Sequence, residues 1–250
     1  WDGTTDTSWY NASDTEFTID SAAGLAGLAQ LVNGGNSFSG ATIQLSDDID
    51  LGGEEWTPIG TSGKPFLGTF DGQNHAISNL TITETDVNAG LFGLLTFPGK
   101  IQNVTVRYAA VDAAENAGAL VGSAFTGTVE NCSATGVIKV TGHYKLGGLI
   151  GEGYANLIGC SVEADPGSAV TATHDGGSLE GDNVGGLIGF KGEDGNKIEN
   201  CSVSGLTVTG TRKVGGLVGS AFDNNIIADS TVRNVTICSN ASSDYIADNP

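Results

Sequence analysis

Short hydrophobic runs, separated by glycine and polar turns, recur along most of the chain. Within the runs, β-branched residues alternate with polar ones, a pattern typical of strands that bury one face. A four-residue glycine word marks the recurrence. Its copies are Gly90–Gly93, Ala119–Gly122, Gly148–Gly151, Gly186–Gly189 and Gly216–Gly219, with a weaker early copy at Trp56–Gly60. The first three copies lie 29 residues apart, so the chain contains an internal repeat of about that length.

A second hydrophobic word, often with Asn or Cys in it, follows each glycine word. Its best copies are Val129–Ser133, Ile158–Val162 and Ile198–Val203, and looser copies are Ile77–Ile82, Ile101–Val106 and Ala228–Val232. A third, vaguer apolar run closes each unit. Three strands per repeat, without a helix-length amphipathic run, predict an all-β solenoid, the parallel β-helix, with one coil per repeat. A leucine-rich solenoid has shorter units, and a propeller blade has four strands in about 40 residues.

Ahead of the repeats, the hydrophobic period changes to that of a helix. The apolar residues on one helical face are Leu25, Leu28, Ala29 and Val32. We therefore predict an N-terminal cap, residues 1–55, with one amphipathic helix at about 21–33 and a first strand at 41–45. The coils are expected over residues 56–250. Because the open end of a solenoid exposes apolar side chains and strand edges, the helix is expected to cover the first coil.

One repeat is longer than the others. The second words stand 28 residues apart from Cys132 to Cys160, but 41 apart from Cys160 to Cys201. The surplus is assigned to residues 163–183, which are expected to form a loop that protrudes from the shaft. No sequence signal of a cap follows Ser239, so the native polypeptide is expected to continue.

Glycine is the most unusual part of the composition, with 39 residues. In a solenoid, a corner repeated in every coil produces a column of glycines, because Gly permits positive φ and leaves out the Cβ. The same register explains three of the four cysteines. Cys132, Cys160 and Cys201 align with Val104 and Leu80, so they are expected to be buried free thiols that act as small hydrophobes, with a disulfide between neighbouring coils as the alternative.

The charge balance narrows the classes of partner. With 10 Lys and Arg against 29 Asp and Glu, the net charge is −19. Nucleic-acid binding needs clustered cations, so no nucleic-acid partner is expected, and docking on anionic lipid is disfavoured for the same reason. No run of 18 apolar residues occurs, so no transmembrane segment is expected in this chain.

The repeated words resemble the GLUG repeats, named after Gly-Leu-hydrophobic-Gly, of bacterial cell-surface and secreted proteins. The leading segments add to the resemblance, among them Trp1–Thr4, Asp47–Leu51 and Phe70–Gly72. The resemblance covers the chain from Trp1 to about Ile237. It implies a right-handed parallel β-helix outside the cell and an adhesin-like role. Some relatives carry these repeats in front of an immunoglobulin A1 protease domain, but the zinc motif of that protease, His-Glu-x-x-His, is missing here, so the activity does not transfer.

The acidic residues of the long repeat are the candidate binding site. Asp165, Asp175, Glu180 and Asp182 lie in its expected loop. A solvated acidic loop is the plain interpretation. Calcium binding is one alternative, since oxygen ligands and glycine turns suit it. Catalysis is the other, because β-helix polysaccharide lyases and hydrolases place acids on neighbouring coils, and a glycosidase needs two carboxyls about 5 to 9.5 Å apart.

Two polar columns follow the repeat. Asn79, Asn103, Asn131 and Asn200 begin glycosylation sequons, but their shared register favours a turn or an amide ladder between coils. The second column precedes each glycine word and consists of Asn88, Asn116, Lys145, Asn183 and Lys213. It is either a solvent face or a repeated binding stripe.

The sequence thus favours a noncatalytic secreted or cell-surface repeat module of bacterial origin, with no cofactor and no catalytic or metal-ligating residues. The expected partner is an extracellular glycan or a host or bacterial surface protein, and the chain is expected to be a monomeric module of a larger protein. The alternative is a carbohydrate-active β-helix enzyme, either a polysaccharide lyase or a glycoside hydrolase, acting through the residues around 165–182.

Overall fold

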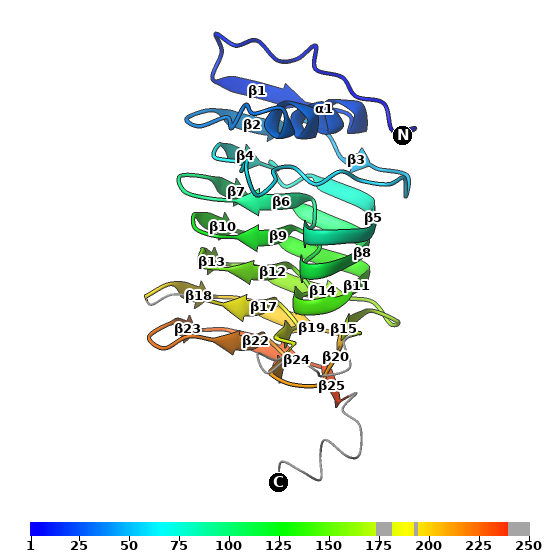
Figure 1. Cartoon of the computed structure of the whole chain (residues 1–250), viewed down its shortest axis with the longest axis vertical. Helices are drawn as coiled ribbons and strands as arrows, with labels where there is room; N and C mark the ends of the chain where they lie inside the picture. Colours follow the sequence, from blue (N-terminus) through cyan, green and yellow to red (C-terminus); the bar gives the residue numbers. More distant parts are fainter. Residues whose placement is uncertain (174–181, 193–194, 240–250) are drawn as a thin grey trace.

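The computed structural model describes residues 1–173, 182–192 and 195–239. The chain forms a parallel β-solenoid of about seven turns, in which three sheets run along the shaft (Figure 1). Every strand-to-strand pairing of the described part is parallel. The all-β solenoid predicted from the repeat is therefore confirmed.

The three sheets are called A, B and C here, in the order in which a coil visits them. Sheet A consists of β1 (Glu16–Ile19), β2 (Thr42–Leu45), β4 (Thr69–Asp71), β7 (Lys100–Gln102), β10 (Thr128–Glu130), β13 (Asn156–Ile158), β18 (Lys197–Glu199) and β23 (Ile226–Ala228). Sheet C consists of β6 (Phe92–Leu95), β9 (Val121–Ala124), β12 (Ile150–Gly153), β17 (Ile188–Lys191) and β22 (Val218–Ala221).

Sheet B is the widest and bends around a corner of the shaft. Its N-terminal members are β3 (Ile49–Asp50), β5 (Ala76–Ala89), β8 (Thr105–Ala117) and β11 (Ser133–Gly147). Later coils divide the same path into β14 (Ser161–Ala164), β15 (Ala169–Ala172) and β16 (Val184–Gly185), then β19 (Ser202–Ser204), β20 (Thr207–Gly210) and β21 (Val214–Gly215), and finally β24 (Thr231–Arg233) and β25 (Thr236–Ser239). The expectation of separate short strands was therefore wrong for β5, β8 and β11, where the second and third runs join.

Stacked hydrophobic columns form the core between the sheets. In sheet A, the parallel register places Ile43, Phe70, Ile101, Val129 and Leu157 one above the other, and all five are fully buried. Neighbouring coils lie about 4.8 Å apart along this stack, as strands of a sheet do. Because each column is continuous, the core of one coil is closed by the coils on either side of it.

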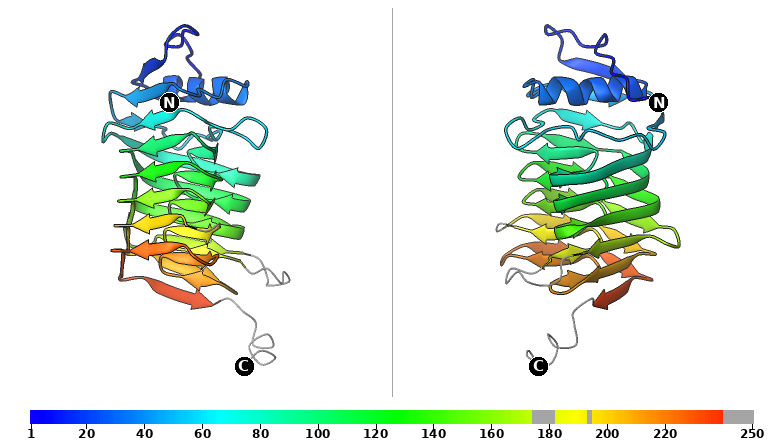
Figure 2. Two further views of the ribbon diagram at one scale, coloured as in Figure 1. Left: turned by 90° about the vertical axis from the view of Figure 1, so that its left-hand side faces the viewer. Right: turned by 45° about the vertical axis from the view of Figure 1, so that its right-hand side comes forward.

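The helix lies at the N-terminal end of the shaft. α1 (Ala22–Asn33) connects β1 to β2, and the Ser21 side chain accepts a hydrogen bond from the Gly24 N–H at 3.3 Å. Figure 2 shows the helix across the end of the stack, with the preceding segment beyond it. Leu25, Leu28 and Val32 are fully buried, so the apolar face predicted from their spacing is the face that packs on the solenoid.

One register inferred from the sequence was wrong. The residue types of Ile77–Ile82 align with those of Ile101–Val106. In the structure, however, Ile77 pairs with Val106 and Leu80 pairs with Ala109, in sheet B. The true partner of Ile101 in the preceding coil is Phe70, in β4. Both alignments bury apolar residues every second position, so hydrophobic alternation alone did not separate them.

The surplus of the long repeat is distributed over three connections. Four positions separate Gly142 from Leu146, whereas twelve separate their partners Ala172 and Val184, so most of the surplus lies there. Smaller additions lie between β14 and β15 and between β17 and β18. The last of these falls outside the range 163–183.

The glycines of the five main copies of the repeated word do not serve as positive-φ corners, although Gly60 of the weaker early copy has a φ of 88°. The corner residues with positive φ are instead those of the second polar column, Asn88 (60°), Asn116 (57°), Lys145 (57°), Asn183 (53°) and Lys213 (54°). A Cβ on Gly122 would lie 2.6 Å from Asn88 Cα, and one on Gly151 would lie 2.5 Å from Ala117 N. These glycines therefore allow the backbone of one coil to approach the corner of the next, and the expectation of positive φ at the glycine word was wrong.

Candidate functional site

Sheet C carries two outward-facing columns beside the polar corner. The parallel register aligns Leu94, Ser123, Glu152, Phe190 and Ser220 in the first column. The second column begins one residue beyond each strand and contains Thr96, Phe125, Tyr154, Gly192 and Phe222. With the corner column, they form a wall on which polar and aromatic side chains are stacked at the coil spacing.

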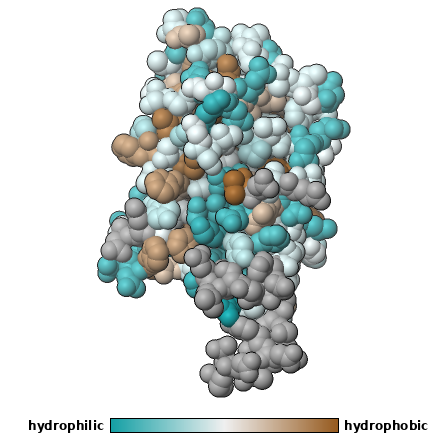
Figure 3. Space-filling view, in the orientation of Figure 1, coloured by the Kyte–Doolittle hydropathy of each residue, from teal (hydrophilic) through white to brown (hydrophobic). Residues whose placement is uncertain are grey.

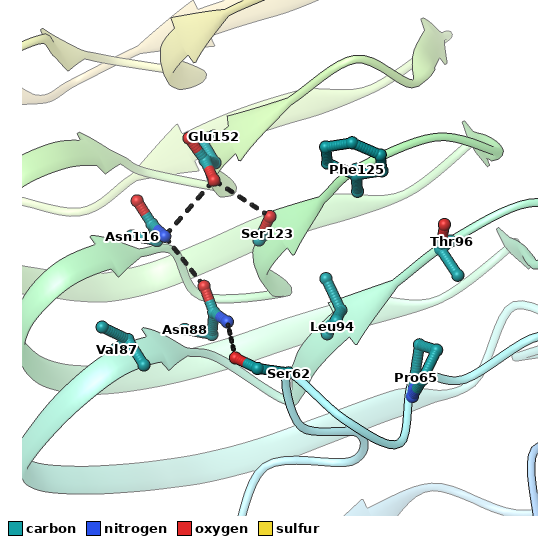
Figure 4. A pocket seen from close by; sticks show the side chains of 10 residues that line it. All are labelled: Ser62, Pro65, Val87, Asn88, Leu94, Thr96, Asn116, Ser123, Phe125 and Glu152. Atoms are coloured by element: carbon teal, nitrogen blue, oxygen red, sulfur yellow. Dashed lines mark hydrogen bonds between the residues drawn. The ribbon is translucent and has the colours of Figure 1, made fainter.

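A shallow groove of about 510 Å³ lies in the N-terminal part of this wall (Figure 4). Its lining residues are Ser62, Pro65, Val87, Asn88, Leu94, Thr96, Asn116, Ser123, Phe125 and Glu152. We call it the sheet C groove. Asn88 and Asn116 lie along one side, and Thr96 and Phe125 lie along the other. The turn that contains Ser62 closes one end, and Glu152 closes the other.

A chain of hydrogen bonds runs along the polar side of the groove. Asn116 Nδ2 donates to Asn88 Oδ1 at 2.8 Å and to Glu152 Oε1 at 3.4 Å. Asn88 Nδ2 donates to the Ser62 hydroxyl at 3.4 Å, and the Ser123 hydroxyl donates to Glu152 Oε1 at 3.2 Å. Three of these four bonds are longer than the usual N–H···O or O–H···O distance, so the network is loosely made.

The negative charge of Glu152, at one end of the groove, is neutralised by a neighbouring lysine. Lys145 Nζ lies 2.6 Å from Glu152 Oε2, and the Glu152 side chain is only 13% exposed. The same ammonium group lies 5.5 Å from the centre of the Phe190 ring, within the range of a cation–π contact. Glu152 is thus held as one half of an ion pair, so the groove as a whole carries little net charge.

Exposed aromatic rings follow the other side of the groove and continue along the wall. Phe125 and Phe222 are exposed, and Phe97, at the turn after β6, is 75% exposed. The rings of Phe125 and Tyr154 lie 5.0 Å apart, and those of Phe190 and Phe222 lie 5.3 Å apart. In the orientation of Figure 1, the space-filling view shows hydrophobic side chains along the left side of this face and hydrophilic ones beside them (Figure 3).

The acidic residues singled out in the sequence are only partly described. Asp175 and Glu180 lie outside the described residues. Asp165 is exposed in the turn between β14 and β15. Asp182 is fully buried, and its carboxylate accepts a hydrogen bond from the Thr211 N–H of the next coil. Asp182 therefore has a structural partner. Ligand binding by the acidic residues of the long repeat stays a prediction.

The first asparagine column forms part of a ladder, as its spacing indicates. Asn131 Nδ2 donates to Asn103 Oδ1 at 3.3 Å, and Asn103 Nδ2 donates to Asp71 Oδ1 at 3.0 Å. Gly159 interrupts the column in the next coil. Asn79 belongs to the sheet B register instead, where it donates to Asp50 at 2.7 Å.

Asp71 is the acceptor at the end of this ladder. Burial by itself raises the pKa of its carboxyl group. Hydrogen bonds from the Gln73 N–H and from the side chains of Asn103, Gln102 and Gln73 outweigh that effect, and the pKa is lowered overall. The charged form of Asp71 is thus the form that stabilises the turn.

The cysteines are free thiols, and three of them are buried in the core. Burial raises the pKa of the Cys132 thiol to about 12. The neighbouring Cys201 thiol, together with burial, keeps the pKa of the Cys160 thiol well above its usual value. Among the described residues, no three His, Cys, Asp or Glu side chains gather in a way that would hold a metal ion. No helix of the described part is long and apolar enough to cross a membrane.

The sequence motif of the repeat matches a known family. The profile described as "The GLUG motif" matches residues 113–141, which run from the end of β8 through Ala119–Gly122 into β11. Two curated relatives also align. Halomucin of Haloquadratum walsbyi is 32% identical over 165 residues, 60% of this chain and 2% of halomucin. A candidate Gly-rich membrane protein of Evansella cellulosilytica is 32% identical over 130 residues, 48% of this chain and 14% of that protein.

The chain thus spans a small part of the curated relatives that it matches. Among solved structures, a candidate immunoglobulin A1 protease from Bacteroides ovatus superposes with a TM-score of 0.64 and 22% identity. The match covers 92% of this chain and 75% of that chain. At this identity, the likeness shows the solenoid fold and nothing about activity. The chain thus carries a GLUG motif at residues 113–141, and the glycine motif that it contains recurs in successive coils of the solenoid.

Proposed function

We propose that the chain is a noncatalytic module of a bacterial cell-surface or extracellular protein and that it binds its ligand in the sheet C groove. The observation that carries the proposal is the pairing of a polar amide network with exposed aromatic rings on one wall of a rigid shaft. Binding sites combine apolar surface with a few placed polar groups in this way. Extended, regular walls are also the surfaces that solenoids use for recognition.

The composition of the groove supports a noncatalytic role. Hydrolysis of a glycosidic bond uses two carboxyl groups about 5 to 9.5 Å apart. Among the described residues that line the groove, Glu152 is the single acidic one, and it is paired with Lys145. A carboxylate held in an ion pair is a poor general acid, because the neighbouring ammonium favours its charged form.

The relatives support a location at the cell surface. One is named halomucin and the other a Gly-rich membrane protein, and in both the matching region is a small part of a longer chain. A stiff, acidic, glycine-rich shaft suits a spacer or ligand-presenting module within such a protein. We therefore propose a monomeric module of a larger surface protein, whose partner is an extracellular glycan or a surface protein.

A binding screen with matched variants tests this proposal. The 250-residue chain is applied to arrays of extracellular glycans and of host and bacterial surface proteins, alongside Phe125→Ala in the groove. Tyr108→Ala, on sheet B, is the control for the loss of a partly exposed aromatic ring. We expect at least one ligand that Phe125→Ala loses and Tyr108→Ala retains. If every captured ligand is insensitive to Phe125→Ala, the groove is not the binding surface.

An activity assay separates the module from the enzyme alternative. The chain is incubated with a panel of polysaccharides, and new reducing ends and unsaturated uronate absorbance are measured. We expect no release above the buffer control. Release that Asp182→Asn or Asp175→Asn abolishes would contradict the noncatalytic assignment and would support the acidic segment as an active site.

A further inference from the structure

Resting on the proposed function, we propose that the ligand of the sheet C groove is a short, uncharged saccharide of about two or three sugar units. Its hydroxyl groups would bind the amides and Glu152, and one sugar ring would stack on Phe125. Four features of the groove point to this class of ligand.

The first feature is the loose polar network. The bonds from Asn88 to Ser62, from Asn116 to Glu152 and from Ser123 to Glu152 measure 3.4, 3.4 and 3.2 Å. A hydroxyl group both donates and accepts, so a saccharide placed between these groups replaces long bonds by shorter ones. A purely apolar ligand would displace water from the amides and the carboxylate without replacing the hydrogen bonds of that water, at a cost in free energy.

The second feature is an acceptor without a donor. Asn116 is 8% exposed, and its Oδ1 is buried and accepts no hydrogen bond. Turning the amide over does not remedy this, because an oxygen would then face Asn88 Oδ1 and the Glu152 carboxylate. A buried acceptor left unpaired is unfavourable. Because Oδ1 is itself shielded from solvent, a ligand hydroxyl relieves this deficit only when the Asn116 side chain turns toward the groove.

The third feature is the aromatic side of the groove. Phe125 is half-exposed, and Tyr154 lies against its ring, which holds Phe125 in place. The C–H groups on the face of a pyranose carry partial positive charge, whereas the face of an aromatic ring is negative. A ring exposed on one face beside hydrogen-bonding amides therefore suits a sugar better than it suits a flat aromatic or an extended peptide.

The fourth feature is the charge and length of the groove. The chain has a net charge of −19. The described residues that line the groove include no cation, and the neighbouring Lys145 is already paired with Glu152, so nothing there attracts an acidic glycan. The lining spans β6, β9 and β12 and is bounded by Ser62 at one end and by Glu152 at the other. Two steps of the coil spacing give a floor of about 10 Å, which suits a few sugar units rather than a long polymer.

Calorimetric titration of the whole chain tests the inference. The probes are gluco-, galacto- and manno-oligosaccharides from one to six units, and the matching uronate oligomers. We expect one neutral series to bind, with Kd falling at least tenfold from the monosaccharide to the trisaccharide and then staying constant. Raising the salt concentration should leave this Kd unchanged.

Two pairs of variants assign the binding to the groove. Asn116→Gly removes the amide, and Gly suits the left-handed backbone there, where φ is 57°. Its control is Asn131→Gly, a corner outside the groove with φ of 52°, which faces Gly159 in the next coil. Phe125→Ala is paired with Tyr108→Ala. We expect each groove variant to weaken binding at least tenfold and each control to leave it within twofold.

The outcomes separate the two proposals. Tighter binding of uronates, or a Kd that still falls beyond four units, overturns the neutral short saccharide. Capture of a protein ligand that Phe125→Ala abolishes, with no saccharide bound at millimolar concentration, overturns this inference and leaves the proposed function standing. Saccharide binding that neither groove variant changes overturns both.

Discussion

Substitution of one glycine measures how tightly the coils pack. In Gly122→Ala, the new Cβ would lie 2.6 Å from both Ala89 N and Asn88 Cα of the preceding coil. Asn88 C lies nearer still, and ordinary contact begins at 3.4 Å, so the backbones must separate by at least about 0.8 Å at this point. The ladder resists that movement, because the Gly118 N–H donates to the Ala89 carbonyl at 3.0 Å close by.

Overpacking in a well-packed core typically costs about 1–3 kcal/mol, and backbone atoms have no other rotamer to adopt. We therefore expect Gly122→Ala to lower the free energy of unfolding by about 3 kcal/mol. In a domain of this size, that loss lowers Tm by roughly 6–12 °C. The control is Gly63→Ala, in an exposed turn with no atom within 4 Å of the new Cβ, for which we expect a change within about 0.5 kcal/mol.

Urea unfolding of the two variants, followed by circular dichroism, is the assay. Tryptophan fluorescence is recorded in parallel, because solenoids can unfold in stages and the two transitions must coincide before free energies are compared. Equal midpoints for Gly122→Ala and Gly63→Ala would refute the close approach as the reason for the glycine word.

Three further predictions concern other buried groups. Asp71→Asn should destabilise the chain by about 1–3 kcal/mol at neutral pH, because hydrogen bonds to a charged acceptor are lost. Folding lowers the pKa of Asp71, so the charged carboxylate stabilises the fold fully at pH values above the unfolded pKa of about 3.9. This stabilisation is lost as the pH falls through the folded-state pKa. The urea midpoints of the wild-type chain and of Asp71→Asn should therefore converge at low pH. Asp182→Ala should lower the free energy of unfolding by about 1–3 kcal/mol, because the Thr211 N–H loses its acceptor. Saccharide binding in the groove, measured by calorimetry, should stay unchanged. Alkylation at pH 8 should modify Cys238 in the folded protein. It should modify Cys132 and Cys160 only after unfolding, because both thiols are buried and their pKa values are raised. Mass spectrometry that found Cys132 modified in the folded chain would contradict this prediction.

The repeat made most of the architecture predictable. In a parallel solenoid, each residue pairs with the residue one repeat later, so the spacing of Ala119–Gly122 and Gly148–Gly151 already contains the register of sheet C. Burial of Cys132 followed from the same reasoning, because the column also accepts Val104. Local periodicity was enough for α1, since its buried face is the one that Leu25, Leu28 and Val32 define.

The sequence did not predict the strand register where two alignments were equally hydrophobic. It also did not predict side-chain contacts between residues that are distant along the chain. Ile77 and Phe70 both precede polar turns, and only the pairing of β4 with β7 shows which of them continues the column of Ile101. The buried carboxylate of Asp182 was unforeseeable because its partner, the Thr211 N–H, lies one coil away. The polar corner at Asn116 was visible as a column, but its role as one side of a groove depends on Phe125 on the opposite side.

The sequence by itself therefore determined the solenoid, its repeat length, its hydrophobic columns and the helix before it, because all of these depend on spacing along the chain. The tertiary structure decided that the repeated glycines serve close approach and that Asn and Lys adopt the positive-φ corner that precedes each of the five main glycine words. It also decided where the groove lies, since stacking brings Asn88, Asn116 and Glu152 of successive coils together. The physical reason is that coils stack about 4.8 Å apart, so residues one repeat apart in the sequence become neighbours in space. The side chains of these neighbours determine which hydrogen bonds and contacts the groove offers.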